Sequence, residues 1–424
     1  MKKKVLIAFL SVVFILCACQ NSQQAAYNVG SITTSDNNTQ KRQVIFATQF
    51  LAPYEAAISL FNETNLEYEI VVKDYSVYEN GQAKLKEDIM AGQGPDIVDL
   101  TSFSCDLFLM NSLDDLLPYI EADNIFGVDD FLPGPFNAMK VDGKLLSIAP
   151  LYSVQTLLCS AITENNAYYY DFNNFISAFP NPNQTFDGLV TKEIFLSYAF
   201  CSCNGSLEWI LNNDEIKVIL QYAKDLPDKP EIKKPDDITL QNPIFIFKAL
   251  SSVNTLRSYK YNYFGTDVSI EGFPFYYKEN TGLIVPAVEV GMLSCSSVKD
   301  GVWQFVKILL SDSFCLPHSM NFFPLLKKQY DYCKTTDDTW INKSGMLFYS
   351  EIDDNAVVKI TDNSDQKLCD YLLSQPCGIY HPNDEIYSIV MYYATQFFNG
   401  AITSDEAAGE ITKQLIIYYE SSIP

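Results

Sequence analysis

Histidine is nearly absent from this chain, and its scarcity bears on metal chemistry. The 424 residues include two histidines, His318 and His381, which do not lie at helical spacing from each other. Zinc sites draw on close groups of histidine and cysteine ligands. The sequence also lacks a Gly-x-Ser-x-Gly elbow, a His-Glu-x-x-His helix and a phosphate loop. We therefore expect no metal, no cofactor and no catalytic centre of these types.

Basic residues are scarce as well. Lys and Arg number 29 against 52 Asp and Glu, which gives a formal net charge of −23. Removing the first 18 residues, which hold three lysines and no acidic residue, makes the charge −26. Such an acidic surface repels nucleic acid and anionic lipid head groups. Neither is an expected partner of the protein surface.

Long apolar runs are missing except at the start of the chain. Three lysines, residues 2–4, precede an apolar run, residues 5–16, that is too short to span a bilayer as a stable helix. The run ends in "LCAC", residues 16–19, which resembles a bacterial lipobox. This arrangement predicts a lipoprotein signal peptide over residues 1–18 and diacylglycerol on Cys19. The alternative is an ordinary secretory signal with an incidental cysteine.

Residues 19–42 form a polar segment rich in Gln, Asn, Ser and Thr, without helical or strand periodicity. Such a composition is typical of a flexible tether. Together, the signal peptide and the tether predict a protein anchored through Cys19 on the outer face of the bacterial cytoplasmic membrane.

Nine cysteines remain after Cys17 and Cys19. An odd number cannot all pair within one chain, so at least one thiol is free or joined to another chain. Cys201 and Cys203 are too close in sequence for the usual zinc or redox pairs. The sequence leaves the disulfide pattern open for Cys105, Cys159, Cys201, Cys203, Cys295, Cys315, Cys333, Cys369 and Cys377.

Two glycines and a proline, Gly92, Gly94 and Pro95, raise the question of a phosphate loop. An amphipathic helix precedes them and a short apolar strand, residues 97–100, follows. Phosphate loops have the reverse order, because phosphate binds at the start of the helix after the strand. The glycines therefore predict a helix-to-strand connection, with Gly92 as a left-handed helix stop.

The residues before this strand extend the same pattern. An apolar strand, residues 44–47, precedes a helical stretch, "PYEAAISLFNETN", and a second strand, "EYEIVVKDY". The β-α-β-α-β alternation over residues 44–100 predicts a parallel sheet with helices on both faces. Open α/β sheets bind ligands beyond the carboxyl ends of their strands. Residues 48–50 and 101–103 are therefore the candidate ligand loops.

Six segments then follow in the order seen in family 1 extracellular solute-binding lipoproteins, the capture components of ATP-driven importers, many of them for sugars. The resemblance covers residues 43 to 422 and is thinnest between 160 and 245. It rests on the order of the segments behind a lipobox, since no single motif is decisive. The segments are "LKEDIMAGQGPDIVDL", "LDDLLPYIEAD", "VDGKLLSIAPLYSVQTL", "VSIEGFP", "VWQFVKILLS" and "IYSIVMYYATQFFNGAITSDEAAGEITKQLIIYYE".

The resemblance implies a two-lobed, type II periplasmic-binding-protein-like α/β fold. Each lobe is a mixed, mainly parallel sheet flanked by helices, and three chain crossings form a hinge. The crossings are expected near "SIAPLYSV" (residues 147–154), near residues 285–286 and around residues 321–331. Lobe 1 is then 43–150 plus 287–326, and lobe 2 is 151–286 plus 327–424. The family also implies a monomer that encloses a small ligand, most often a sugar, and meets membrane permease subunits.

Sugar pockets combine aromatic faces with amides, hydroxyls and carboxylates. Aromatic residues make up 14% of the chain, and most Phe and Tyr belong in the core. Positions at strand ends, or where family members contact ligand, are better candidates. The predicted ligand-binding residues are Gln49, Phe50, Thr101, Ser102, Phe103, Tyr152, Asn204, Asn254 and Arg257. Arg257, expected as a lone cation at a strand end, would instead favour an acidic sugar or a peptide by pairing a carboxylate.

Other functions stay open on the sequence. A lipid-anchored extracellular glycoside hydrolase needs two carboxylates across a cleft. With 52 acidic residues some pair meets that condition by chance, so the count carries no weight. A binding protein for peptides or other solutes, and a structural adhesion protein, are the further alternatives.

Overall fold

The computed structural model describes residues 41–160, 172–186, 188–201, 213–230, 245–260, 264, 267–270, 282–319, 321–334, 364–375 and 378–421. Cys19, the predicted signal peptide, the tether up to residue 40 and Asn204 lie outside these residues. In the described part of the chain, no helix is long and apolar enough to cross a membrane. Among the cysteines whose side chains are described, Cys105, Cys295 and Cys315 are free thiols.

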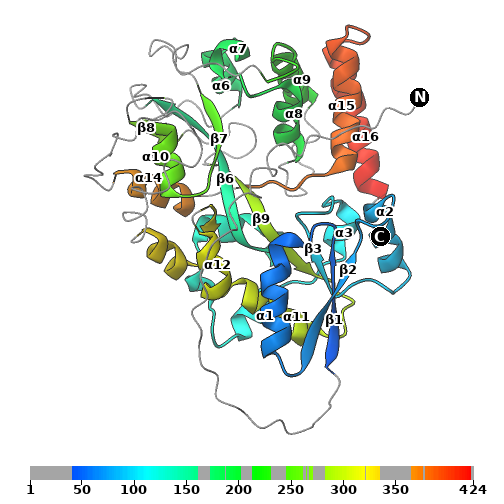
Figure 1. The fold of residues 1–424 in the computed structure, drawn as a ribbon. Helices are drawn as coiled ribbons and strands as arrows, with labels where there is room; N and C mark the ends of the chain where they lie inside the picture. Colours follow the sequence, from blue (N-terminus) through cyan, green and yellow to red (C-terminus); the bar gives the residue numbers. More distant parts are fainter. Residues whose placement is uncertain are drawn as a thin grey trace. The chain divides into compact units, whose positions relative to one another are not determined.

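The main feature is a mixed sheet with the strand order β10-β6-β9-β3-β1-β2 (Figure 1). Strand β11 pairs with β9, and β7 and β8 pair with β6. The strands are β1 (Arg42–Thr48), β2 (Tyr68–Asp74), β3 (Ile97–Asp99), β6 (Ile148–Ser160), β7 (Ile246–Leu250), β8 (Val268–Ile270), β9 (Leu283–Met292), β10 (Phe323–Pro324) and β11 (Gly378–Ile379), and a separate hairpin joins β4 (Lys140–Val141) and β5 (Lys144–Leu145).

The predicted β-α-β-α-β unit is confirmed. Strand β1 pairs in parallel with both β2 and β3, and the connecting helices are α1 (Glu55–Thr64) and α2 (Gly81–Met90). The side chain of Asn80 caps α2 by accepting a bond from the backbone of Ala83. Gly92 follows with φ of +68°, the left-handed conformation predicted for it. Because this turn precedes β3, the glycines connect a helix to a strand.

The long strands β6 and β9 run alongside each other in antiparallel register (Figure 1). Tyr152 of β6 pairs with Pro286 of β9 on one side and with Phe323 of β10 on the other. The three segments in which chain crossings were predicted thus lie side by side at Tyr152. The division into two lobes stays a prediction, because the pairing alone does not show where the chain bends.

Helices α1 and α11 (Lys299–Leu309) cover the sheet near β1 and β2 and share one hydrophobic core with it. The ring of Phe305 lies 5.6 Å from that of Phe61 and 6.0 Å from that of Phe46. Gly301 lets α11 approach β2 closely, because a Cβ there would lie 2.5 Å from the ring of Tyr68. An Ala at this position would push the helix away from the strand.

A second core lies among four helices that contact one another: α8 (Lys192–Cys201), α9 (Asn213–Lys224), α15 (Asp384–Phe398) and α16 (Ser404–Ser421). Its buried side chains include Phe195, Leu220, Val390 and Leu415. The other helices are η2 (Ala52–Tyr54), α3 (Leu107–Asn111), α4 (Leu117–Ala122), η3 (Val128–Asp130), α5 (Pro133–Ala138), α6 (Phe172–Ala178), α7 (Pro182–Thr185), α10 (Val253–Tyr259), α12 (Asp312–His318) and α14 (Ser364–Ser374).

Candidate ligand-binding site at the strand ends

The loops that follow β1 and β3 meet at the carboxyl edge of the parallel strands. The backbone amide of Gln49 donates to the hydroxyl of Ser102 at 3.0 Å, and the Gln49 side-chain amide donates to the Ser102 carbonyl at 2.6 Å. The amide of Phe50 donates to the Thr48 hydroxyl at 2.8 Å. Four predicted site residues, Gln49, Phe50, Thr101 and Ser102, therefore come together as expected for strand ends.

A buried carboxylate, Asp99, organises this meeting point. It accepts hydrogen bonds from the hydroxyls of Thr48 at 2.7 Å, Tyr54 at 2.6 Å and Thr101 at 2.6 Å. Burial raises the pKa of the Asp99 carboxyl, although these hydrogen bonds oppose the shift. Asp99 was missed as a site residue; the available signal was a charged residue inside the apolar strand.

Gln49 is also held from the side of α2. A Cβ on Gly81, the first residue of that helix, would lie 2.7 Å from the Gln49 side-chain carbonyl oxygen and 2.6 Å from the backbone oxygen of Tyr75. A larger residue at position 81 would therefore displace Gln49 or the loop after β2. The amide of Gln49 is fixed between Ser102 and the start of α2.

Phe50 supplies an accessible aromatic face at this edge. Its side chain is 48% exposed, unlike the core phenylalanines. The loop after β2 is bonded to the end of β1 through the amide of Tyr75 and the carbonyl of Thr48. That loop carries two more exposed apolar side chains, Val77 and Tyr78. An exposed ring beside hydroxyls and an amide is the combination that stacks on a sugar and holds its hydroxyls.

The structure does not bring the rings of Phe103 and Tyr152 into the site. Phe103 is 2% exposed, and its ring lies 5.7 Å from that of buried Tyr75. Tyr152 is fully buried, with its ring 6.1 Å from that of Phe323. Both rings therefore pack in the core.

Asn254 and Arg257 lie in α10, which begins three residues after the end of β7. The expectation of a lone cation at a strand end is wrong. Buried Arg257 pairs with Asp365 of α14 at 3.3 Å and donates to the side chain of Asn254 at 3.4 Å. Asp365 also pairs with Lys260, at 3.2 Å. The guanidinium is thus used to join two helices.

A second polar group lies behind the strand ends, at Glu289 of β9. The carboxylate of buried Glu289 lies 2.8 Å from Nε2 of His381 and also accepts the hydroxyl of Ser147. Its backbone carbonyl accepts the Tyr54 hydroxyl at 3.2 Å, which links it to Asp99. Ser147 is fully buried and bonded to the glutamate instead of the imidazole, so this trio does not have the arrangement of a hydrolase triad.

Tyrosines gather beside His381. The ring of Tyr380 stacks on that of Tyr198 at 4.6 Å, and Tyr198 meets Phe247 edge to face at 4.8 Å. The Tyr380 hydroxyl also hydrogen-bonds Ser197 at 2.8 Å. Sequence reasoning missed this cluster, because its members come from three segments far apart in the chain.

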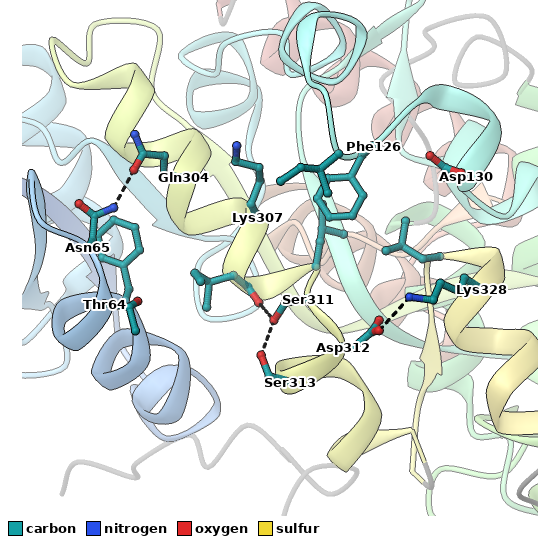
Figure 2. A pocket seen from close by; sticks show the side chains of 15 residues that line it. Thr64, Asn65, Phe126, Asp130, Gln304, Lys307, Ser311, Asp312, Ser313 and Lys328 are labelled. Atoms are coloured by element: carbon teal, nitrogen blue, oxygen red, sulfur yellow. Dashed lines mark hydrogen bonds and ion pairs between the residues drawn. The ribbon is translucent and has the colours of Figure 1, made fainter. Parts of the chain in front are cut away.

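A cavity of about 830 Å³ lies elsewhere, between α1, α11, α12 and the segment around residues 125–130. Figure 2 shows Asn65 bonded to Gln304, and Asp312 paired with Lys328, along its wall. Asn65 also accepts the amide of Tyr68, so this wall lies at the start of β2, the amino edge of the parallel strands. The carboxyl edge is the better candidate, because ligands of open α/β sheets bind there.

No protein-family model matches the chain, and no curated protein matches it. Among solved structures, the sugar-binding protein MalE from the phytopathogen Xanthomonas citri is similar, with a TM-score of 0.54 and 12% identity over 89% of this chain and 98% of that one. A de novo designed esterase has a TM-score of 0.51 and 12% identity over 90% of this chain and 100% of that one. A designed cysteine esterase has a TM-score of 0.51 and 13% identity over 90% and 99%.

Identities this low establish a likeness of fold, and fold does not by itself separate binding from catalysis. The mixed sheet, its flanking helices and the two long antiparallel strands agree with that likeness. The chain has an α/β fold of the type II periplasmic-binding-protein kind.

Proposed function

We propose that the protein is the extracellular solute-binding component of an ABC importer and captures a mono- or oligosaccharide. The observation that carries the proposal is the exposure of Phe50 in a loop that is bonded through its neighbour Gln49 to Ser102 at the carboxyl edge of the sheet. The likeness to a sugar-binding protein supports the same assignment. We expect no catalytic activity.

The chemistry of the edge suits a neutral ligand. The predicted site residues that meet there carry an amide, hydroxyls and an exposed ring, while Asp99 is fully buried and Arg257 is paired with Asp365. A neutral ligand held by stacking and uncharged hydrogen bonds binds with little dependence on salt. A peptide or acidic sugar would need a charged partner, which makes such ligands the second candidates.

Capture by hinge closure is part of the proposal. A ligand that touches both predicted lobes favours the closed state through the extra contacts made there. The three neighbouring strand segments at Tyr152, from β6, β9 and β10, are the place where the bend would occur. Delivery to permease subunits, a monomeric state and anchoring through Cys19 complete the proposal.

The test is calorimetry of the purified protein against neutral oligosaccharides, uronic-acid sugars and peptides at low and high salt. We expect saturable heat with a neutral sugar, little change with salt and no product after prolonged incubation. Heat with peptides alone, or affinity that collapses with salt, would overturn the neutral-sugar assignment. Turnover of an oligosaccharide would instead support the hydrolase alternative. Mass spectrometry of any ligand carried through purification gives its identity directly.

A further inference from the structure

The loop that carries Thr101 and Ser102 continues into residues 104–107, and these are bonded to a distant part of the chain. The amide of Cys105 donates to the carbonyl of Pro382 at 3.0 Å, and the amide of Asp384 donates to the hydroxyl of Ser104 at 3.0 Å. The amide of Leu107 donates to the hydroxyl of Tyr418 at 3.2 Å. The last helix therefore contacts the loop that follows β3.

Asn383 connects these contacts. Its side-chain oxygen accepts the amide of Ile386 at 3.0 Å and so caps the start of α15. Its side-chain nitrogen donates to the Tyr418 hydroxyl at 3.0 Å and to the Cys105 carbonyl at 3.5 Å. Both Asn383 and Tyr418 are 7% exposed, so little water is available to replace these bonds.

The loop is held from its other sides as well. Gln82 of α2 donates to the Ser104 carbonyl at 2.9 Å and accepts the Ser104 amide at 3.0 Å. Asp99 holds the loop at Thr101 through two bonds, of 2.6 and 3.0 Å. Of these attachments, the one to Asn383 and Tyr418 is formed by residues that belong to the opposite predicted lobe.

We propose that Asn383 and Tyr418 are positioning residues for the ligand site: their bonds to residues 105 and 107 set the position of Thr101 and Ser102. The inference rests on the proposed function, because it assumes that this loop contacts the ligand. The proposal gives the last helix, α16, a direct part in holding the loop after β3. The contact is the hydroxyl of Tyr418, which accepts the amide of Leu107 from 311 positions away in the sequence.

The test measures amide hydrogen exchange of residues 100–108 in the purified protein by mass spectrometry and NMR. Tyr418→Phe removes the hydroxyl and keeps the ring. The matched control is Tyr419→Phe, which removes the hydroxyl of a buried tyrosine at the next position of the same helix. A second variant, Asn383→Ser, keeps a side chain able to cap α15 and removes the amide donor.

We expect amide exchange at Leu107 and Cys105 to become roughly 3- to 10-fold faster in Tyr418→Phe and Asn383→Ser. This is the change in the opening equilibrium that the loss of one net hydrogen bond produces. The acceleration should extend to Thr101 and Ser102, and Tyr419→Phe should leave all four amides unchanged. Equal exchange in Tyr418→Phe and Tyr419→Phe would overturn the proposal. So would acceleration that stops at Leu107, because the contact would then be structural alone.

The outcome does not depend on the identity of the ligand. If the exchange pattern is as expected but the wild-type protein binds no sugar in calorimetry, the proposed function fails while the positioning of the loop stands. If sugar binds and the exchange pattern is absent, the positioning role fails while the proposed function stands.

Discussion

The hydroxyl of Thr48 donates a 2.7 Å hydrogen bond to the carboxylate of Asp99, and this bond joins two strand ends that are 51 positions apart in the sequence. Tyr54 and Thr101 donate to the same carboxylate. Because Asp99 is fully buried, each of these donors replaces a bond that water would otherwise make. The shape of the candidate site thus depends on a side chain behind it that no ligand is expected to reach.

Replacing Asp99 by Asn should change how stability varies with pH. Burial raises the pKa of the Asp99 carboxyl, so the folded protein binds this proton more tightly than the unfolded chain does. The resulting stabilisation is complete below the usual aspartate pKa, about 3.9, and is lost as pH rises through the higher folded value. Urea unfolding of wild type and Asp99→Asn from pH 3.5 to 7 measures this pH-dependent contribution to the free energy of unfolding.

We expect the advantage of wild type over Asp99→Asn to shrink as pH rises across that window. An advantage that grows with pH would mean that the hydrogen bonds from Thr48, Tyr54 and Thr101 outweigh burial and lower the pKa. The stability of the variant also reports the bonds themselves, each contributing about 1 kcal/mol.

Asp88 should show the opposite dependence. Burial alone would raise its pKa, but bonds from Lys73, Lys84 and Tyr75 overcome it and lower the pKa to about 2. A depressed aspartate pKa gives stability that is present above about 3.9 and is lost as pH falls toward the folded value. Asp88→Asn should therefore lower the free energy of unfolding by about 2 kcal/mol at pH 7, after allowance for solvent screening of the lysines.

Denaturant unfolding of Asp88→Asn between pH 3 and 7 checks this. The loss should shrink as pH falls below 4, because Asp88 in the unfolded wild-type chain then takes up a proton while the folded carboxylate stays ionised. A loss that stays constant over the range would show that hydrogen bonding and not charge is responsible. Sugar binding serves as the control and should be nearly unchanged.

The parallel strands and the meeting of their carboxyl ends were predictable, because local patterns determine them. The alternation of apolar strands and amphipathic helices over residues 44–100 needs no distant partner, and a left-handed stop at Gly92 follows from the backbone freedom of glycine. The rule for open α/β sheets then places Gln49, Phe50, Thr101 and Ser102 at one edge. These four meet in the structure.

The residues that were misplaced depend on tertiary context. Tyr152 lies in a strand buried on both faces, so the sequence shows no alternation from which its direction could be read. Arg257 was expected at a strand end, but Ser252 caps a helix there by accepting the amide of Thr255. That serine was a usable signal. Glu289, the adjacent residues Tyr380 and His381, and Tyr418 come from three separate segments, and no local pattern indicates that these segments meet near the site.

Arg257 should therefore matter for stability and not for ligand binding. Its side chain and that of Asp365 are 7% and 13% exposed. Removing one partner of a buried pair leaves the other uncompensated, which costs about 3–5 kcal/mol. Because Lys260 also pairs with Asp365, we expect Arg257→Gln to cost about 3 kcal/mol, the low end of this range. Thermal unfolding and calorimetry with a neutral sugar measure the two effects, and weaker sugar binding at unchanged stability would place Arg257 in the ligand site.

Phe50 and Phe103, on neighbouring loops, should differ in what their side chains contribute. Phe50 is 48% exposed at the strand ends, whereas Phe103 is 2% exposed and packs on Tyr75. Phe50→Ala should weaken sugar binding by about 1–3 kcal/mol, because a stacked ring is lost, and should change stability by less than about 1 kcal/mol. Phe103→Ala should instead lower stability by about 3–5 kcal/mol through the cavity it leaves. Calorimetry and denaturant unfolding of both variants separate the two roles. Unchanged affinity in Phe50→Ala would remove the observation that carries the sugar assignment, and the ligand would then have to be sought among solutes that need no aromatic face.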